Sequence, residues 1–317
     1  MSLSRPAIFP LLKLPWLSIK CVLQHWDEFV LIYFATVSNR TRRIVQYSDY
    51  PLKEIDVHLN GSKRIRIGDQ KSCECFDTCR GHYLESYTAG EELDALKNGV
   101  DFMIDVFGCT IRQVLVDGQT ISKPLELGIT SVSVLFISGA EPVFLADLKH
   151  LLENIKVTDE YVFFAQVSND FHCDPQIFKS PKLSFSHINS ADWVTLEILC
   201  QFDVPKLNFS HHRFTSQDIV SYITHWFNSE NKKLEYLFVI FTGKVSRRDF
   251  NINHLNPMQF CEKRRSRCPL KGAEPWETTD MSLGMDILRK DGLLATFHVT
   301  SNSIFFYIWH KRFPDPV

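Results

Sequence analysis

The sequence has 317 residues, of which 44% are hydrophobic and 23% are charged. These fractions are those of an ordinary globular protein, and they exclude a disordered or fibrous chain. The formal net charge of −2 gives no global field that would collect nucleic acid or an anionic membrane, so partners must be recognised through local surfaces. The length allows one large domain or two of ordinary size.

The cysteine content and the apolar N-terminal stretch bear on the compartment. The nine cysteines are an odd number, which suits a reducing environment better than a disulfide scaffold. Lys13, Lys20, Asp27 and Glu28 interrupt the apolar residues 8–37, and no small-residue cleavage site follows, so we do not interpret this stretch as a signal peptide. No uncharged run reaches the roughly 20 residues that span a bilayer. We therefore expect a cytoplasmic protein, a nuclear protein, or both.

Three short helices are predicted first, within residues 15–45. Pro15 suits the first position of a helix, because its missing N–H would have no partner there. A second apolar helix is predicted at 29–37 and a basic one at 39–45. Such a unit buries little core and needs a neighbour or a partner to cover it. The first helix has apolar residues at the i, i+3, i+4, i+7 positions of one face: Ile19, Val22, Leu23 and Trp26.

Residues 9–46 resemble an F-box, the three-helix motif that binds the Skp-type linker of Skp–cullin–F-box ubiquitin ligases. The pair Leu14-Pro15 opens the motif, and Leu17 and Val30 stand where the motif usually has acidic residues. The alternative is a helical hairpin that belongs to the main domain. The resemblance implies ten linker-binding residues: Leu14, Pro15, Ile19, Val22, Leu23, Trp26, Leu31, Ile32, Val37 and Ile44. We expect part of one group among them to face outward, namely part of Leu14, Ile19, Leu23, Leu31 and Ile32.

The connecting segment, residues 47–88, contains a predicted hairpin and a group of possible metal ligands. Residues 55–67 alternate between apolar and polar around the turn signal Asn60-Gly61. The ligand types of a zinc site follow, but no second pair at standard spacing closes a tetrahedral site. We therefore favour a solvated loop with reduced thiols and expect no metal. The residues concerned are Cys73, Cys75, Cys79 and His82.

The main domain, residues 89–317, contains an internal repeat. The segment Pro181 to His187 is a near copy of Pro205 to His211, offset by 24 residues. This period lies in the leucine-rich-repeat range of about 20 to 29 residues. Because a helical segment follows each copy, the strands must be parallel and joined by crossovers. We expect Leu183, Phe185, Leu207, Phe209, Leu237 and Val239 on adjacent parallel strands, covered by the helix of Tyr222, Ile223 and Trp226.

Weaker units of the same pattern extend the predicted array over about 89–241. Strands are expected at 112–116, 132–137, 161–165 and 234–241, and a helix is expected at 142–154. Thr215 and Asp218 predict a capping box at the start of the most regular helix. The segments 293–298 and 304–309 flank a polar turn and predict a C-terminal hairpin.

A second resemblance covers residues 190–237. The motifs that carry it are Asp192 to Leu196, Phe214-Thr215 with Asp218, His225-Trp226, and Leu234 to Leu237. They resemble the type-two F-box-associated domain, which accompanies the F-box in an expanded nematode family. We place this region at about 181–250 within the repeat domain. The resemblance implies a role in binding a substrate protein, and it names no particular target.

Motifs for catalysis and cofactors are not found in the sequence. Glycine-rich phosphate loops and zinc-hydrolase helices do not occur, and the histidines His211, His212 and His225 have no nucleophile or ligand at motif spacing. We interpret these histidines as turn and helix-surface residues. The basic run Lys263 to Arg267 is either a solvated loop or a nuclear-localisation or phosphate-contacting patch.

Together, these motifs and patterns predict a non-catalytic α/β protein without a cofactor. It has an N-terminal three-helix F-box, an irregular leucine-rich-repeat-like β/α array and a C-terminal β-hairpin. Its expected role is that of a substrate receptor, bound to the Skp-type linker and through it to a cullin scaffold, and recruiting a target protein for ubiquitination. The alternative is a repeat-type binding module that does not engage a ligase. Neither a membrane nor a nucleic acid is expected as a partner.

Overall fold

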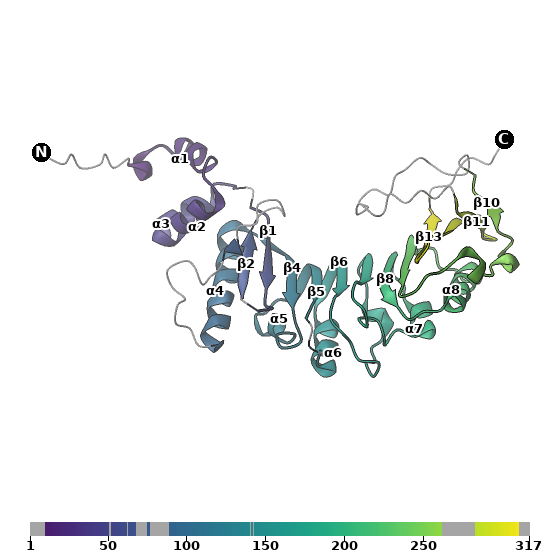
Figure 1. The fold of residues 1–317 in the computed structure, drawn as a ribbon. Coiled ribbons are helices and arrows are strands. Elements are labelled where there is room, and N and C mark those ends of the chain that lie inside the picture. The colour runs from purple at the N-terminus through teal and green to yellow at the C-terminus, as the bar shows by residue number, and fades with distance from the viewer. Residues whose placement is uncertain are drawn as a thin grey trace, which may run out of the picture. The chain divides into compact units, whose positions relative to one another are not determined.

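A computed structural model describes residues 10–50, 52–61, 63–67, 75–76, 89–139, 141, 143–261 and 283–310. The chain forms two compact units, Met1–Arg112 and Gln113–Val317, whose elements are labelled in Figure 1. The domain bounds 9–46, 47–88 and 89–317 stay predictions. Among the described residues, none of the helices combines the length and the apolar character that crossing a membrane requires.

The first unit begins with helices where the sequence predicts them. A 3₁₀ turn (Leu11–Lys13) precedes α1 (Trp16–Leu23), α2 (Glu28–Val37) and α3 (Asn39–Gln46). The Asp27 carboxylate caps α2 by accepting a hydrogen bond from the Val30 N–H at 2.9 Å. A capping box of Ser38 and Thr41 starts α3. These caps satisfy backbone donors that a first helical turn leaves unpaired, so each helix has a defined start.

A fourth helix, α4 (Ala89–Phe107), supplies the neighbour that the three short helices need. Its Val106 joins their shared core, with Phe102 and Phe107 packed against it. Polar contacts strengthen this junction, because Arg42 bonds Asp105 at 2.7 Å and its guanidinium lies 5.2 Å from the Phe102 ring centre. The core of this helical module is formed by Ile19, Leu23, Leu31, Ala35 and Val45.

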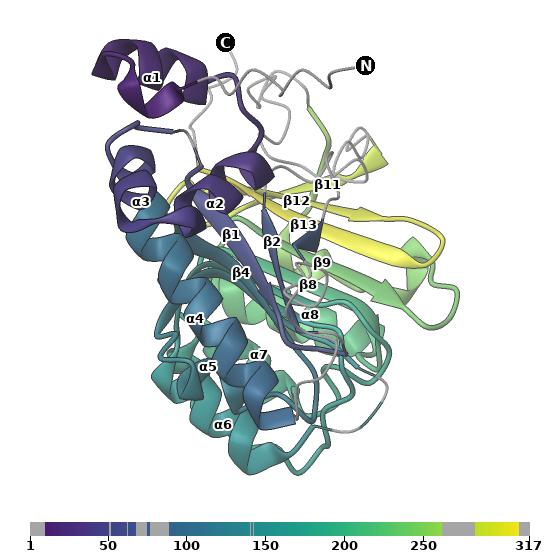
Figure 2. The same ribbon diagram turned by 90° about the vertical axis from the view of Figure 1, so that its left-hand side faces the viewer.

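The predicted hairpin is present as β1 (Glu54–His58) and β2 (Arg64–Ile67), which pair antiparallel with Ile55 opposite Ile67. Gly61 in the turn has a φ of 61°, a left-handed conformation that favours glycine. The short strand β3 (Cys75–Phe76) continues the pairing on β2. Figure 2 shows α4 beside β1 and β2, and the buried residues Val57 and Ile65 belong to the apolar face of this hairpin.

The second unit is built on parallel strands. β4 (Thr110–Val116), whose first residues belong to the first unit, is followed by β5 (Ser131–Ile137), β6 (Lys156–Phe163), β7 (Lys182–Phe185), β8 (Lys206–His212) and β9 (Tyr236–Phe241). The helices α5 (Lys123–Glu126), α6 (Leu145–Asn154), α7 (Leu196–Gln201) and α8 (Ser216–Asn228) all lie on the same face of this sheet (Figure 1). Each crossover helix therefore covers the apolar side of the strands that it connects.

The internal repeat of 24 residues determines the register of the central strands. Leu183 pairs with Leu207, which pairs with Leu237, and Phe185, Phe209 and Val239 follow in the same way. This prediction is confirmed, with the helix of Tyr222, Ile223 and Trp226 buried in the same unit. Phe163, Phe185 and Phe209 form a ring stack with centroid separations of 5.0 and 4.9 Å. Identical residues at one repeat position thus produce a continuous aromatic core.

The predicted capping box at Thr215 and Asp218 is also confirmed. Other boundaries differ from the prediction by a few residues. β6 starts at Lys156 rather than Tyr161, because the strand begins directly after α6, and α6 starts at Leu145 rather than Pro142. Further 3₁₀ turns are at Pro175–Ile177, Arg247–Asp249 and Asn253–Leu255.

The predicted C-terminal hairpin consists of β12 (Leu294–Val299) and β13 (Ser303–Trp309), paired antiparallel. β13 also pairs antiparallel with β9, so the hairpin extends the parallel sheet. β11 (Met285–Leu288) and β10 (Met258–Gln259) continue on the far side of β12. The second unit is therefore a mixed α/β structure in which the sheet changes from parallel to antiparallel at β9.

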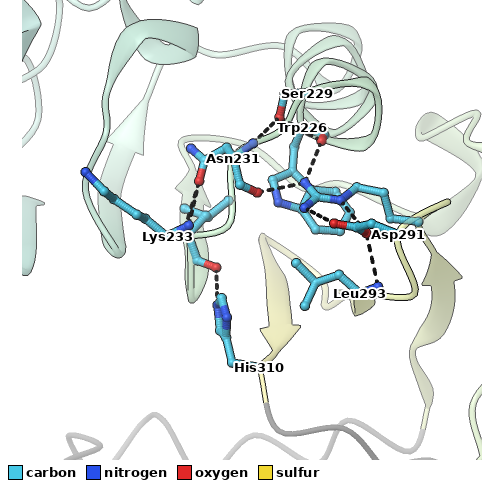
Figure 3. A network of polar contacts seen from close by, with 9 residues as sticks. Trp226, Ser229, Asn231, Lys233, Asp291, Leu293 and His310 are labelled. Atoms are coloured by element: carbon cyan, nitrogen blue, oxygen red, sulfur yellow. Dashed lines mark hydrogen bonds and ion pairs between the residues drawn. The ribbon is translucent and has the colours of Figure 1, made fainter.

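A buried arginine ties the turn between β11 and β12 to the end of α8; its partners Trp226, Asn231 and Asp291 are labelled in Figure 3. Arg289 is 3% exposed and donates to the carbonyl oxygens of Trp226 and Asn231, at 3.2 and 2.7 Å. It also binds both carboxylate oxygens of Asp291, and its guanidinium lies 4.7 Å from the Trp226 ring centre. Hydrogen-bonded partners surround the buried charge, as burial of a charge requires. We call these residues the Arg289 clasp.

Candidate functional site

The structure buries four of the ten residues predicted to bind the linker. Ile19, Leu23, Leu31 and Ile32 are buried and Leu14 is half-buried, so Leu14 is the accessible part of the five residues that we expected to face outward in part. The physical reason is α4, which covers the face that three short helices alone would leave open. The remaining predicted residues are accessible in part: Leu14, Val22, Trp26 and Ile44 are half-buried, and Pro15 and Val37 are exposed.

A different set of side chains gives the helical module an exposed apolar surface. Leu17 and Tyr33 are each 74% exposed, Val37 is 62% exposed and Tyr47 is 70% exposed, while Trp16 and Val30 are exposed to a smaller degree. We call these six residues the module surface. Most of them were not predicted from the sequence, because they lie off the apolar stripe of each helix. The sequence feature that could have indicated this surface is the presence of apolar residues, Leu17 and Val30, at positions where the F-box motif usually has acidic residues.

A groove between the start of α1 and α3 adjoins this surface. It has a volume of about 630 Å³ and combines aromatic and basic side chains. The Arg40 guanidinium donates to the Leu12 carbonyl at 3.0 Å, which fastens the 3₁₀ turn before α1 to α3. Aromatic and arginine residues are the types most enriched in protein interfaces. The lining residues are Trp16, Asn39, Arg40, Arg43, Ile44 and Tyr47.

In the second unit, the face of the parallel sheet opposite the helices carries a line of polar side chains. The Asn208 amide donates to the Ser184 hydroxyl at 3.2 Å, which donates to the Glu160 carboxylate at 2.6 Å. Lys182 pairs with the same carboxylate at 3.3 Å. Hydrogen bonds thus connect three neighbouring strands, β6, β7 and β8, and fix the orientation of these side chains. We call this side of the sheet the open face.

Aromatic groups flank the polar line on the open face. On one side, Phe136 packs on Phe164, and Phe164 packs on His187, with centroid separations of 6.1 and 5.2 Å. On the other side, Phe238 of β9 stacks on Phe305 of β13 at 4.3 Å. The strand Tyr236–Phe241, which is apolar at every position, was the signal that both faces of the sheet bear apolar groups.

The buried histidine His212 has a structural role. The Nε2 atom of His212 lies 2.8 Å from the Ala191 carbonyl, and its Nδ1 atom accepts a hydrogen bond from the Phe214 N–H at 2.9 Å. Burial lowers the pKa of His212, because it disfavours the charged imidazolium. The neutral ring therefore connects β8 to the segment before α7 through Ala191 and to the segment before α8 through Phe214.

The possible zinc ligands and the basic run that the sequence suggests lie largely outside the described residues. Within the described ranges, no three His, Cys, Asp or Glu residues are grouped so that they could hold a metal ion. The possible zinc ligands at 73, 79 and 82 and the basic run at 263–267 lie outside the described residues, as does the side chain of Cys75. That the chain is not an enzyme stays a prediction.

Comparisons with known proteins agree with the second resemblance. The family model described as F-box associated matches residues 172–239, a segment that contains β7, α7, β8, α8 and most of β9. The uncharacterized proteins F59B2.8 and F59B2.9 of Caenorhabditis elegans are each 27% identical to the chain over 134 residues. These matches cover 41% and 40% of this chain and 31% of the length of each relative.

No solved structure matches the chain. The predicted F-box-associated region, about 181–250, overlaps most of the matched segment, which begins nine residues earlier and ends eleven residues earlier. The parallel β/α repeats from β7 to β9 are therefore the part of this chain that is similar to an F-box-associated domain.

Proposed function

We propose that this chain is a substrate-recognition subunit of a Skp–cullin–F-box ubiquitin ligase. In this proposal the helical module binds the Skp-type linker, and through it the cullin, while the leucine-rich-repeat-like array of the second unit holds a target protein. The reaction itself is carried out by the other subunits, and the contribution of this chain is the high effective concentration of a tethered target. Such a complex would work in the cytoplasm, the nucleus or both.

The observation that carries the proposal is the F-box-associated match at residues 172–239. Domains of this description accompany an F-box, and the helices α1, α2 and α3 lie in the region that resembles one. The module surface supports the docking role, because large exposed apolar side chains gather on one small module. The open face supports the receptor role, since aromatic groups beside a fixed polar line are suited to binding a protein.

Docking is tested with a variant of the module surface, Leu17→Asp with Val37→Asp. Both side chains are exposed, so the fold should tolerate the change, whereas two carboxylates in an apolar interface would be costly. Recovery of linker and cullin with the tagged chain should fall at least about tenfold, since hot-spot residues contribute about 2 kcal/mol or more each. Circular dichroism and thermal unfolding of the variant should match the wild type.

The matched control carries the same charge change in the second unit, as Phe144→Asp with Leu288→Asp. These side chains are also exposed, and linker recovery should stay at the wild-type level. Undiminished recovery with the module variant, or an equal loss with the control, would contradict docking through the module surface. If wild-type chain recovers no linker at all, the alternative of a binding module that does not engage a ligase replaces the proposal.

A further inference from the structure

The groove between the start of α1 and α3 contains two arginines that the proposed function does not use. On the opposite side of α3, Arg42 and Gln46 bond Asp105 of α4, so the acidic contact of this helix lies away from the groove. We call the groove the arginine groove. Four of its lining residues share one face of α3 and its C-cap, since they are spaced by three, four and seven positions: Arg40, Arg43, Ile44 and Tyr47.

The two arginines of the groove have no carboxylate partner among the described residues. The Arg40 guanidinium donates to a carbonyl oxygen, that of Leu12, which leaves its charge uncompensated. The Arg43 side chain forms neither a hydrogen bond nor an ion pair with any described residue. Both side chains are exposed and line the groove, so they are accessible to a ligand.

The acidic side chains of the same helices are all engaged elsewhere. Residues 10–50 contain three of them, and none lines the groove. Asp27 caps α2, Asp49 pairs with Lys20 at 2.6 Å, and Glu28 interacts with the Tyr50 hydroxyl. The arginine groove is therefore left with two positive charges that none of the described carboxylates neutralises.

The other lining residues indicate what kind of anion fits. Arginine and the Trp16 indole are hydrogen-bond donors only, so the ligand must accept hydrogen bonds, and a guanidinium matches the two oxygens of a carboxylate. Trp16, Ile44 and Tyr47 add apolar surface that a free anion would leave uncovered. Two arginines are also few for a nucleic acid, which is held through many phosphate contacts. A peptide that combines carboxylates with an apolar side chain satisfies both halves of the groove.

The size and the place of the groove suit such a segment. Its volume of about 630 Å³ lies within the range of about 300 to 1,000 Å³ that is usual for binding pockets. Trp16 and Tyr47 belong to the groove and to the module surface alike, so the two are continuous. A protein that covers the module surface would therefore also reach Arg40 and Arg43.

We propose that the arginine groove binds an acidic segment of the protein that docks on the module surface. Carboxylates of the segment pair with Arg40 and Arg43, and an apolar side chain between them packs on Trp16 and Tyr47. The inference rests on the proposed function for the identity of this partner, and it adds the chemistry by which the partner is recognised. Because the arginines are exposed, their charge should mainly increase the rate of association and make docking depend on salt.

Binding is tested on the purified full chain with a fluorescent peptide in which glutamates flank a leucine. Fluorescence anisotropy measures its affinity. The same peptide with glutamine in place of glutamate should bind at least about tenfold more weakly, and the peptide with alanine in place of leucine should also bind more weakly. Raising the salt from about 0.1 M to about 1 M should weaken the glutamate peptide strongly, because the screening length falls from about 10 Å to about 3 Å.

Arg43→Glu is the decisive variant, because it reverses one charge at an exposed position. The glutamate peptide should bind it at least about tenfold more weakly than it binds the wild type. A lysine version of the peptide should bind the variant more tightly than the wild type, which damage to the fold would not produce. Arg43→Gln should have an intermediate effect. Arg248→Glu, at an exposed arginine of the second unit, is the matched control and should bind the glutamate peptide normally.

The partner is tested by competition. An excess of the glutamate peptide should reduce the recovery of the linker with the tagged chain, and the glutamine peptide should not. A peptide that binds the groove without reducing this recovery would refute the assignment of the segment to the docking partner. Failure of the proposed function looks different, since wild-type chain would then recover no linker even without peptide.

Three further results would overturn the proposal. The first is that the glutamate peptide binds no more tightly than the glutamine peptide. The second is that Arg43→Glu binds the glutamate peptide as the wild type does. The third is that inorganic phosphate binds as tightly as the peptide, which would assign the groove to small anions. These three measurements need neither linker nor cullin, so their outcome is separate from that of the docking experiment.

Discussion

Replacing Arg289 with methionine tests the clasp that joins the turn between β11 and β12 to the end of α8. Methionine keeps much of the side-chain volume but removes every donor. The Asn231 carbonyl then loses its bond from Arg289, while the Trp226 carbonyl keeps those from the backbone and hydroxyl of Ser229. Hydrogen bonds to charged groups contribute about 1.5 to 3 kcal/mol each. Because the Asp291 side chain is 35% exposed, its ion pair adds little after solvent screening.

The expected cost is therefore about 3 kcal/mol in the free energy of unfolding, including the loss of the guanidinium contact with the Trp226 ring. Urea denaturation followed by tryptophan fluorescence and by circular dichroism measures it, provided that the two probes give coincident transitions. Arg248→Met, at an exposed arginine, should change stability by no more than about 0.5 kcal/mol. If Arg289→Met costs no more than this control, the clasp does not stabilise the unit.

The dependence of stability on pH provides a second test of the contact between Arg289 and Asp291. The hydrogen bond from Arg289 lowers the pKa of Asp291 to about 2. A depressed folded-state pKa means that the stabilisation is complete above the unfolded value near 4 and is lost as the pH falls toward 2. Arg289→Met should remove this part of the acid dependence. A slope between pH 4 and pH 2 that is the same in both proteins would refute the assignment to this pair.

Two further predictions concern the second unit. Trp226→Ala should lower the free energy of unfolding by about 3 to 5 kcal/mol in urea denaturation, because it removes a large side chain that is packed on Phe306 and fully buried; a loss below about 1 kcal/mol would contradict its place in the core. Because burial lowers the pKa of His212, the folded state resists its protonation, so this residue should make stability decrease as the pH falls below its unfolded value of about 6.5. His212→Gln should flatten that part of the stability profile, and an unchanged profile would show that His212 does not cause it.

The sequence predicted the parts of the fold that depend on local repetition. Pro181 to His187 and Pro205 to His211 occupy equivalent strand positions because each is followed by a helix of its own, so their pairing follows from the repeat alone. The turn at Asn60-Gly61 and the capping box at Thr215 rest on nearest-neighbour chemistry and were predictable for the same reason.

Contacts between distant segments were not predictable in this way. Nothing within residues 9–46 indicates that Val106 completes the core of the helical module, and this contact determines that Ile19 and Leu23 are buried while Leu17 is exposed. The exposed surface of the helical module therefore depends on a tertiary contact that a single sequence does not encode locally.

The change from parallel to antiparallel pairing at β9 has a consequence for solubility. A stack of parallel repeats ends in a strand whose N–H and C=O groups have no partner, and such an edge invites pairing with another chain. β13 occupies that position, since its residues from Ser303 to Tyr307 pair with β9 from Ile240 to Tyr236. A chain shortened to end before β12 would leave β9 as a bare, apolar edge. It should aggregate, even though every repeat of the parallel array is still present.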